Sequence, residues 1–206
     1  MFTGKIVVFA LLAFAPSIEA AIVFTDFQAT ICCTLGVSNH GGSPQGLAGQ
    51  FIPGANYIMT DAQVKVEENG TFVPTFNLFL YSDLTGLPGV SLGAIGGGTA
   101  PSSAAFNIVT VGSPAFFLNS GTPYWLVMTP NTSTDVFWAG GGFPSPLSAY
   151  DQSAIGASPW FLPGTAVSLQ FQIDGTPAGT PEPGTWILFG TAMAGFWLAR
   201  RRARSL

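Results

Sequence analysis

Short apolar runs separated by glycine and proline are the feature that most constrains the fold of this chain. Turn signals recur about every 8–15 residues, and no long amphipathic helical pattern lies between them. Glycine and proline supply 26 and 16 of the 206 residues, and the 18 phenylalanines favour strands over helices. The sequence therefore predicts an all-β fold, an antiparallel β-sandwich of roughly eight to ten strands with a jelly-roll-like arrangement.

The predicted strands share an alternating or fully apolar pattern bounded by these turns. They are residues 22–28, 51–52, 57–67, 76–81, 90–95, 105–111, 115–118, 124–128, 136–138, 147–150 and 167–173. The run 124–128 consists of five bulky residues in a row, which indicates a strand covered on both faces.

Three local signals predict how some of these strands connect. Asn69-Gly70 predicts a hairpin that pairs 57–67 with 76–81. The alternation places Val64 and Val66 on one face of the first strand, and Phe76, Leu78 and Leu80 inward on the second. Pro88-Gly89 predicts a turn before the next strand, because glycine accepts a positive φ. The run Gly96–Gly98 predicts a break after that strand.

The end of the chain contains three segments in series. Residues 176–184 form a linker that contains Pro181, Glu182 and Pro183, and proline keeps such a segment extended. Residues 185–199 carry no charge. Four arginines then fall within five positions, at Arg200, Arg201, Arg202 and Arg204. An uncharged run that stops at clustered arginines predicts a single transmembrane helix over 185–199 and a cytoplasmic tail over 200–206.

The predicted helix is short for a membrane span. Its fifteen residues reach roughly 22 Å as a helix, against a hydrocarbon core of ~30 Å. Snorkelling arginines and local thinning of the bilayer close this gap, so the segment is interpreted as a marginal, temporary anchor. The alternative is a terminal helix buried against the globular domain.

The first twenty residues have the form of a secretory signal peptide. Lys5 precedes an apolar stretch over 6–15, and small residues follow up to Ala20. Cleavage is predicted after Ala20, with Ala21 as a nearby alternative, and an uncleaved N-terminal anchor is the other interpretation. The β-sandwich domain then spans 21–175 and faces the periplasm.

The order of Pro-Glu-Pro, apolar helix and arginine cluster resembles the PEP-CTERM sorting signal of Gram-negative bacteria. The resemblance implies recognition of Pro181, Glu182 and Pro183 by exosortase, a membrane-embedded cysteine transpeptidase, with the arginines as membrane-retention charges. It also implies delivery to the cell surface or extracellular matrix, with exopolysaccharide as a candidate partner. Turn motifs over 80–83, 86–89 and 121–126 resemble choice-of-anchor ectodomains, which implies a β-sandwich and no particular ligand.

The body offers little chemistry that would indicate an enzyme. His40 is the single histidine, and no Gly-x-Ser-x-Gly elbow supplies a nucleophile for it. We therefore expect no catalytic residue and no cofactor. Asp83, Asp135 and Asp151 lie near turns and have the oxygen ligands that Ca²⁺ prefers, but no calcium-loop spacing supports them, so no metal site is predicted.

The charge of the body excludes nucleic acid as a partner. Between residues 21 and 183 a single base, Lys65, stands against nine acids. The three-part tail and the absence of a catalytic set together predict an exported, non-catalytic surface or matrix protein. The alternative is a lectin-like carbohydrate-binding module or a Ca-dependent adhesion module, for which Trp138 and Trp160 are candidate glycan-stacking rings.

Cys32 and Cys33 are the only cysteines and are adjacent. Three interpretations remain open from the sequence: a strained vicinal disulfide, two free or buried thiols, or a bond to another chain.

Overall fold

A computed structural model describes eleven parts of the chain. These are residues 20–28, 30–37, 45–68, 74–101, 105–131, 135–141, 148–151, 160–162, 167–179, 190–193 and 200. The predicted signal peptide lies outside these residues except for Ala20, so the structure does not test it.

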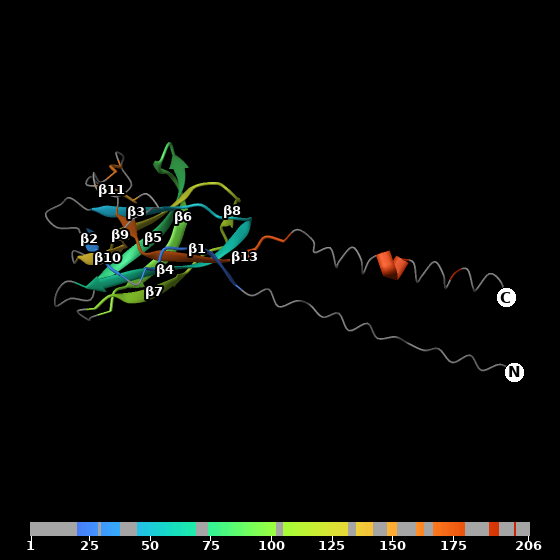
Figure 1. Cartoon of the computed structure of the whole chain (residues 1–206), viewed down its shortest axis with the longest axis horizontal. Helices are drawn as coiled ribbons and strands as arrows, with labels where there is room; N and C mark the ends of the chain where they lie inside the picture. The colour runs from blue at the N-terminus through green and yellow to red at the C-terminus, as the bar shows by residue number, and fades with distance from the viewer. Residues whose placement is uncertain are drawn as a thin grey trace.

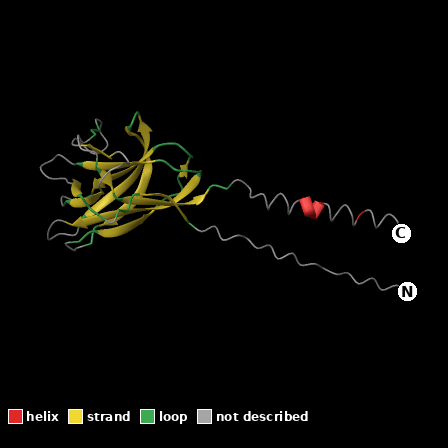
Figure 2. Ribbon diagram, in the orientation of Figure 1, coloured by secondary structure: helices red, strands yellow, loops and turns green. Residues whose placement is uncertain are grey.

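The described residues form an all-β sandwich of two antiparallel sheets (Figure 1, Figure 2). Sheet A has the order β1 (Ala21–Thr25), β13 (Phe171–Pro177), β4 (Tyr57–Glu68), β10 (Val136–Gly141) and β12 (Ser168–Leu169). Three further strands join it, with β2 (Cys33–Val37) on β10, and β7 (Asn107–Gly112) and β8 (Phe117–Leu118) on β4. Sheet B has the order β11 (Ser148–Asp151), β3 (Gly46–Phe51), β9 (Tyr124–Pro130), β5 (Thr75–Leu84) and β6 (Leu87–Thr99).

The main core lies between the two sheets and takes alternate side chains from each. Val64 and Val66 enter it from β4, and Phe76 and Leu78 enter it from β5. The period of two in the sequence predicted these inward positions correctly. Strand β9 is buried along its whole length, as its run of bulky residues predicted.

A second, smaller apolar cluster covers the outer face of sheet B. It consists of Ala48, Tyr81, Trp125, Val127 and Trp160. Trp125 therefore points away from the main core and is still fully buried. This cluster explains why β9 needs apolar side chains on both faces.

The predicted pairing of 57–67 with 76–81 is wrong. Strand β4 belongs to sheet A and pairs with β7, β8, β10 and β13, whereas β5 belongs to sheet B and pairs with β6 and β9. The alternation of both strands is real, but each faces the core from the opposite side. Asn69 and Gly70 lie outside the described residues.

The hairpin that the structure does contain joins β5 to β6 through Thr85 and Gly86. Both residues have positive φ, 53° and 84°, as a two-residue turn between right-twisted strands requires. The predicted turn at Pro88-Gly89 is therefore wrong, because both residues lie inside edge strand β6. An edge strand tolerates proline because one of its sides has no ladder partner.

The predicted break at Gly96–Gly98 is also wrong, since β6 continues to Thr99. A Cβ on Gly96 would stand 2.8 Å from Cγ1 of Val111, and one on Gly98 would overlap the ring of Phe76. These glycines thus give core side chains room to pack against the backbone of the strand.

Strands β12 and β13 are one continuous run that changes partner at Gln170. The Gln170 N–H donates to the Ala139 carbonyl of β10 (2.9 Å), and the Gln170 carbonyl accepts from the Lys65 N–H of β4 (3.2 Å). The Trp138 indole also donates to the Gln170 carbonyl, with an Nε1–O distance of 2.9 Å. Gln170 therefore joins three strands of sheet A in the buried interior.

Candidate functional site

The sorting tail lies mostly outside the described residues. This holds for Pro181, Glu182 and Pro183, and also for Arg201, Arg202 and Arg204. Residues 190–193 are helical and exposed, as is Arg200. Within the described part of the chain, no helix is long and apolar enough to cross a bilayer. The predicted transmembrane helix over 185–199 therefore stays a prediction.

The root of this tail is fixed at one end of the sandwich. The Ala178 N–H donates to the Asn56 carbonyl (2.9 Å), and the Asn56 Oδ1 accepts from the Ser120 N–H (2.8 Å). The Ser120 hydroxyl donates to the Gly54 carbonyl at 3.0 Å. We call this end, formed by residues 20–22, 52–60, 112–124 and 176–179, the tether pole. Its loops and the departing strand β13 are thus held together before the chain leaves the domain.

A second polar site centres on Asp83 at the end of β5. Its Oδ1 accepts from the Gln50 amide (2.8 Å) and from the Trp125 indole (2.8 Å), and its Oδ2 accepts from the Gly86 N–H (3.1 Å). Burial raises the pKa of Asp83, but these three hydrogen bonds outweigh it and hold the pKa below its ordinary value. The carboxylate therefore closes the β5–β6 turn and satisfies a buried indole, which is a structural use of its charge.

Two carboxylates face each other on the outer face of sheet A. Asp61 and Asp174 are direct cross-strand partners of β4 and β13. The amides of Gln63 and Gln172 donate to Asp174, whereas the Thr60 hydroxyl donates to Asp61. Burial raises the pKa of Asp61, and the neighbouring Asp174 raises it further against the Thr60 hydrogen bond. More than one hundred residues separate these two acids in the sequence, so no spacing signal could have found the pair.

Both cysteines are free thiols in the structure, which is one of the three interpretations that the sequence leaves open. Cys32 is exposed, while Cys33 is half-buried at the start of β2 beside Gly140. Burial, followed by the hydrogen bond and charge of Cys32, raises the pKa of Cys33 to about 11. Of the three interpretations of this pair, the geometry fits two free thiols.

The two candidate glycan-stacking rings, Trp138 and Trp160, are both buried, which counts against the alternative of a carbohydrate-binding module. Trp138 is 0% exposed and stands edge-on to Phe171 in the main core. Trp160 is 7% exposed and stands edge-on to Tyr81 over sheet B. Neither ring presents a face to solvent, because Trp138 belongs to the main core and Trp160 to the cluster over sheet B.

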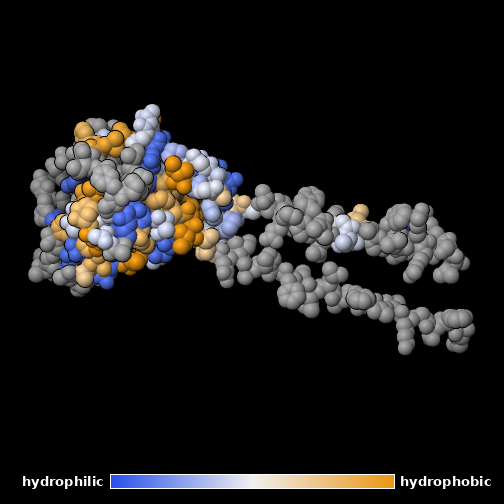
Figure 3. Space-filling model, viewed as in Figure 1, coloured by the Kyte–Doolittle hydropathy of each residue, from blue (hydrophilic) through white to orange (hydrophobic). Residues whose placement is uncertain are grey.

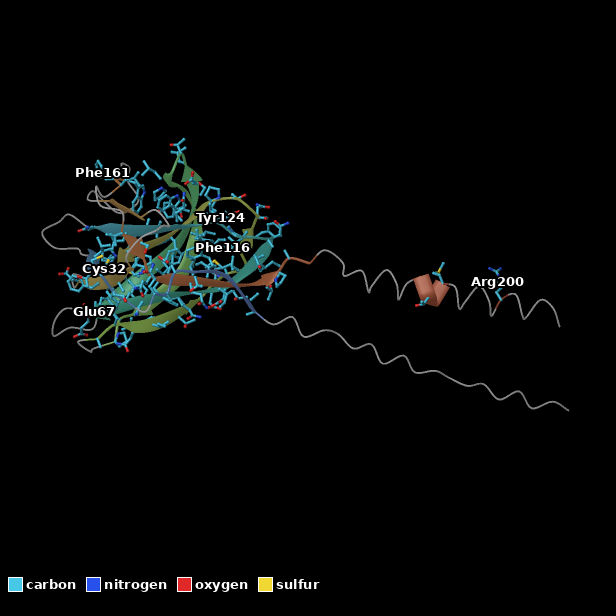
Figure 4. The ribbon with its side chains drawn as sticks, viewed as in Figure 1. Cys32, Glu67, Phe116, Tyr124, Phe161 and Arg200 are labelled. Carbon is cyan, nitrogen blue, oxygen red and sulfur yellow. The ribbon has the colours of Figure 1, made fainter. Side chains whose placement is uncertain are left out.

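The remaining predicted site residues give no cluster. His40 lies outside the described residues. In the described ranges, no three His, Cys, Asp or Glu side chains come together in a way that would hold a metal ion. Figure 4 shows Cys32 between Phe161 and Glu67 at the end of the body away from the departing C-terminal chain.

Comparison with known proteins bears on the tail and on the body separately. The family model described as the PEP-CTERM protein-sorting motif matches residues 180–202. No curated protein matches the chain. Among solved structures, the clostridial cysteine protease Cwp84 after propeptide cleavage aligns with a TM-score of 0.56 and 11% identity. The alignment covers 79% of this chain and 41% of that chain, and at this identity it shows the fold alone.

The fold and the tail together define the class: an all-β sandwich followed by a sorting signal. The signal is a PEP-CTERM motif, which implies export, membrane anchoring and subsequent processing by exosortase.

Proposed function

We propose that this chain is a non-catalytic protein of the surface or extracellular matrix of a Gram-negative bacterium. It is exported through the inner membrane, held there briefly by its C-terminal helix, and released by an exosortase that recognises Pro181, Glu182 and Pro183. The observation that carries the proposal is the sorting motif over 180–202.

The use of the polar groups in the body supports a non-catalytic role. Asp83 has three donors that fix a turn and an indole. Asp174 is buried and holds two glutamine amides. Both carboxylates thus accept hydrogen bonds from groups of the fold itself.

Proteolytic sorting is tested by comparing cells with and without the sorting enzyme. With the enzyme, intact mass should show loss of the residues beyond the cut, and the protein should leave the membrane fraction. The triple variant Pro181→Ala, Glu182→Ala, Pro183→Ala should keep its full mass and stay in the membrane. The matched control is Pro177→Ala, which also removes a proline near the tether but lies outside the matched residues. Equal masses and locations in both strains would refute the proposal.

The proposal also includes residence in an exopolysaccharide matrix after release. The resemblance of the tail is its support, and its test is separate. The released body should co-sediment with cell-free exopolysaccharide from the same strain. Recovery of all the protein in the supernatant, with sorting intact, would remove the matrix part and leave the sorting part standing.

A further inference from the structure

The tether pole has no charged side chain, a property that it shares with the edge strand β6 of sheet B. None of its residues, 20–22, 52–60, 112–124 and 176–179, is Asp, Glu, Lys, Arg or His, and all of them are described. Glu67 and Glu68 lie at the other end of β4. The pole ends at the Asp61–Asp174 pair, since Asp61 pairs with Gly112 and Asp174 pairs with Ile22. Cleavage after Ala20 would add one α-amino group at Ala21.

The same pole exposes four large apolar side chains. Ile22 is 58% exposed, Ile52 53%, Ile58 38% and Phe117 54%. Ile58 and Phe117 are direct partners between β4 and β8, so they stand side by side on the outer face of sheet A. Figure 3 shows apolar side chains at the surface of the body, with hydrophilic and neutral residues next to the departing chain.

The length of the linker places this pole near the membrane. Ala178 is tied to Asn56, and the uncharged run begins at Thr185, seven residues further on. Seven extended residues span at most about 25 Å. A chain that is anchored through 185–199 therefore keeps the tether pole within about 25 Å of the hydrocarbon boundary, and part of that distance is lipid headgroups.

We propose that the tether pole seats in the headgroup region of the phospholipid bilayer while the chain is anchored. This inference rests on the anchoring step of the proposed function. Burial of four half-exposed apolar side chains favours the contact, and no side-chain charge has to be desolvated. Of the charge-free surfaces of the body, the pole is the one that the linker holds near the bilayer.

Because the linker keeps the tether pole at the bilayer, a weak contact between the pole and the lipid headgroups is enough to seat it. Tethering raises the effective concentration of the pole at the membrane to about the millimolar range. An affinity too weak to bind the free domain therefore still seats the anchored one. The seated pole also holds the linker and its Pro-Glu-Pro segment close to the membrane plane, where a membrane-embedded enzyme acts.

The contact is measured with the full chain in vesicles of phosphatidylethanolamine and phosphatidylglycerol. In a Cys32→Ser, Cys33→Ser background, Gly54→Cys receives an environment-sensitive fluorophore, and a nitroxide is placed on lipid headgroups. Gly54 suits this purpose because a Cβ there meets no atom within 4 Å. The control label is Glu67→Cys. The result expected is a blue shift and strong quenching at position 54 and neither at position 67.

Substitutions test which side chains bind the tether pole to the bilayer. Ile58→Thr with Phe117→Thr should weaken the seated state about 25-fold, because each half-exposed side chain is worth about fivefold in partitioning. The matched control, Ile108→Thr with Leu162→Thr, alters side chains that are 54% and 51% exposed and should leave quenching unchanged. Ile108 pairs with Lys65, seven residues along β4 from Ile58 and so about 23 Å away.

Three results would overturn the inference. Absence of quenching at position 54 in a chain that resists carbonate extraction removes the pole contact and leaves anchoring intact. A chain that carbonate extracts fails the anchoring step itself, and the inference falls with it. Quenching that disappears when protein is diluted at constant lipid indicates that a second copy, not lipid, covers the pole.

Discussion

Removal of the Asp83 carboxylate should destabilise the sandwich more than its position near a surface turn suggests. Asp83→Ala leaves the Trp125 indole and the Gln50 amide without their acceptor and frees the Gly86 N–H. Trp125 is fully buried, so its unpaired N–H costs about 1–3 kcal/mol. Asp83 itself is only partly buried, which lets water replace the other two bonds in part. We expect a total loss of about 2–3 kcal/mol.

Asp83→Asn separates the acceptor from the charge. The amide oxygen still accepts from Trp125, so the expected loss at pH 7 is only about 0.5–1.5 kcal/mol. The pKa of Asp83 lies below its ordinary value, so the contribution of the charge is complete above the unfolded pKa of about 4. It is lost as the pH falls through the folded pKa. The difference between the wild-type chain and Asp83→Asn should therefore shrink below about pH 4.

Urea unfolding followed by tryptophan fluorescence measures these differences. Near the thermal midpoint, Asp83→Ala should lower Tm by about 5–10 °C for a domain of this size. The control is Glu67→Ala, which removes a carboxylate at the far end of β4 and should change stability by less than about 0.5 kcal/mol. If Asp83→Ala stays within that margin, or if Asp83→Asn costs as much as Asp83→Ala, the assignment of the carboxylate to Trp125 is refuted.

Three further predictions concern other sites of the body. Asp61→Asn should stabilise the chain at pH 7 by about 0.2–1 kcal/mol, since Asp61 faces Asp174 across the strands. Because the pKa of Asp61 is raised, its ionised form lowers the stability of the folded chain above the folded pKa. The stability gained by Asp61→Asn should therefore vanish in urea titrations as the pH falls towards 4. A gain that grows on acidification would contradict this prediction. The pKa of Cys33 is raised to about 11, so its thiol should react with iodoacetamide at pH 8 about a hundredfold more slowly than a model thiol. Mass spectrometry of timed samples measures the two rates, and equal rates would contradict the prediction. Trp138→Phe removes the donor to the Gln170 carbonyl and leaves a gap in the core, so denaturation should report a loss of about 2–3 kcal/mol, and a loss under 1 kcal/mol would count against it.

The alternation of residues within single strands predicted the burial pattern well, but it could not predict which strands pair. Val64 and Val66 point into the core as expected, and so do Phe76 and Leu78. Alternation of apolar and polar residues shows that one face of a strand is buried, but it does not show which sheet contains that strand. For this reason the strongest hairpin signal, Asn69-Gly70, led to a pairing of two strands that lie in different sheets.

The aromatic residues show a related limit. Trp138 and Trp160 lie beside glycine- and proline-rich segments, which suggested exposed rings. In the structure both rings are buried by packing: Trp138 lies in the main core, and Trp160 lies in the cluster over sheet B. The sorting tail was easier to predict, because its signal is the order of three neighbouring segments and does not depend on tertiary contacts.

The position of β13 decides how the domain carries load from its tail. This strand lies between β1 and β4, and its last residues lead directly into the linker. A pull on the linker along the strand direction acts on both ladders at once, in shear, and not on one hydrogen bond after another. A force of this kind is therefore shared by many hydrogen bonds in parallel, and the domain resists mechanical extraction of its own terminal strand.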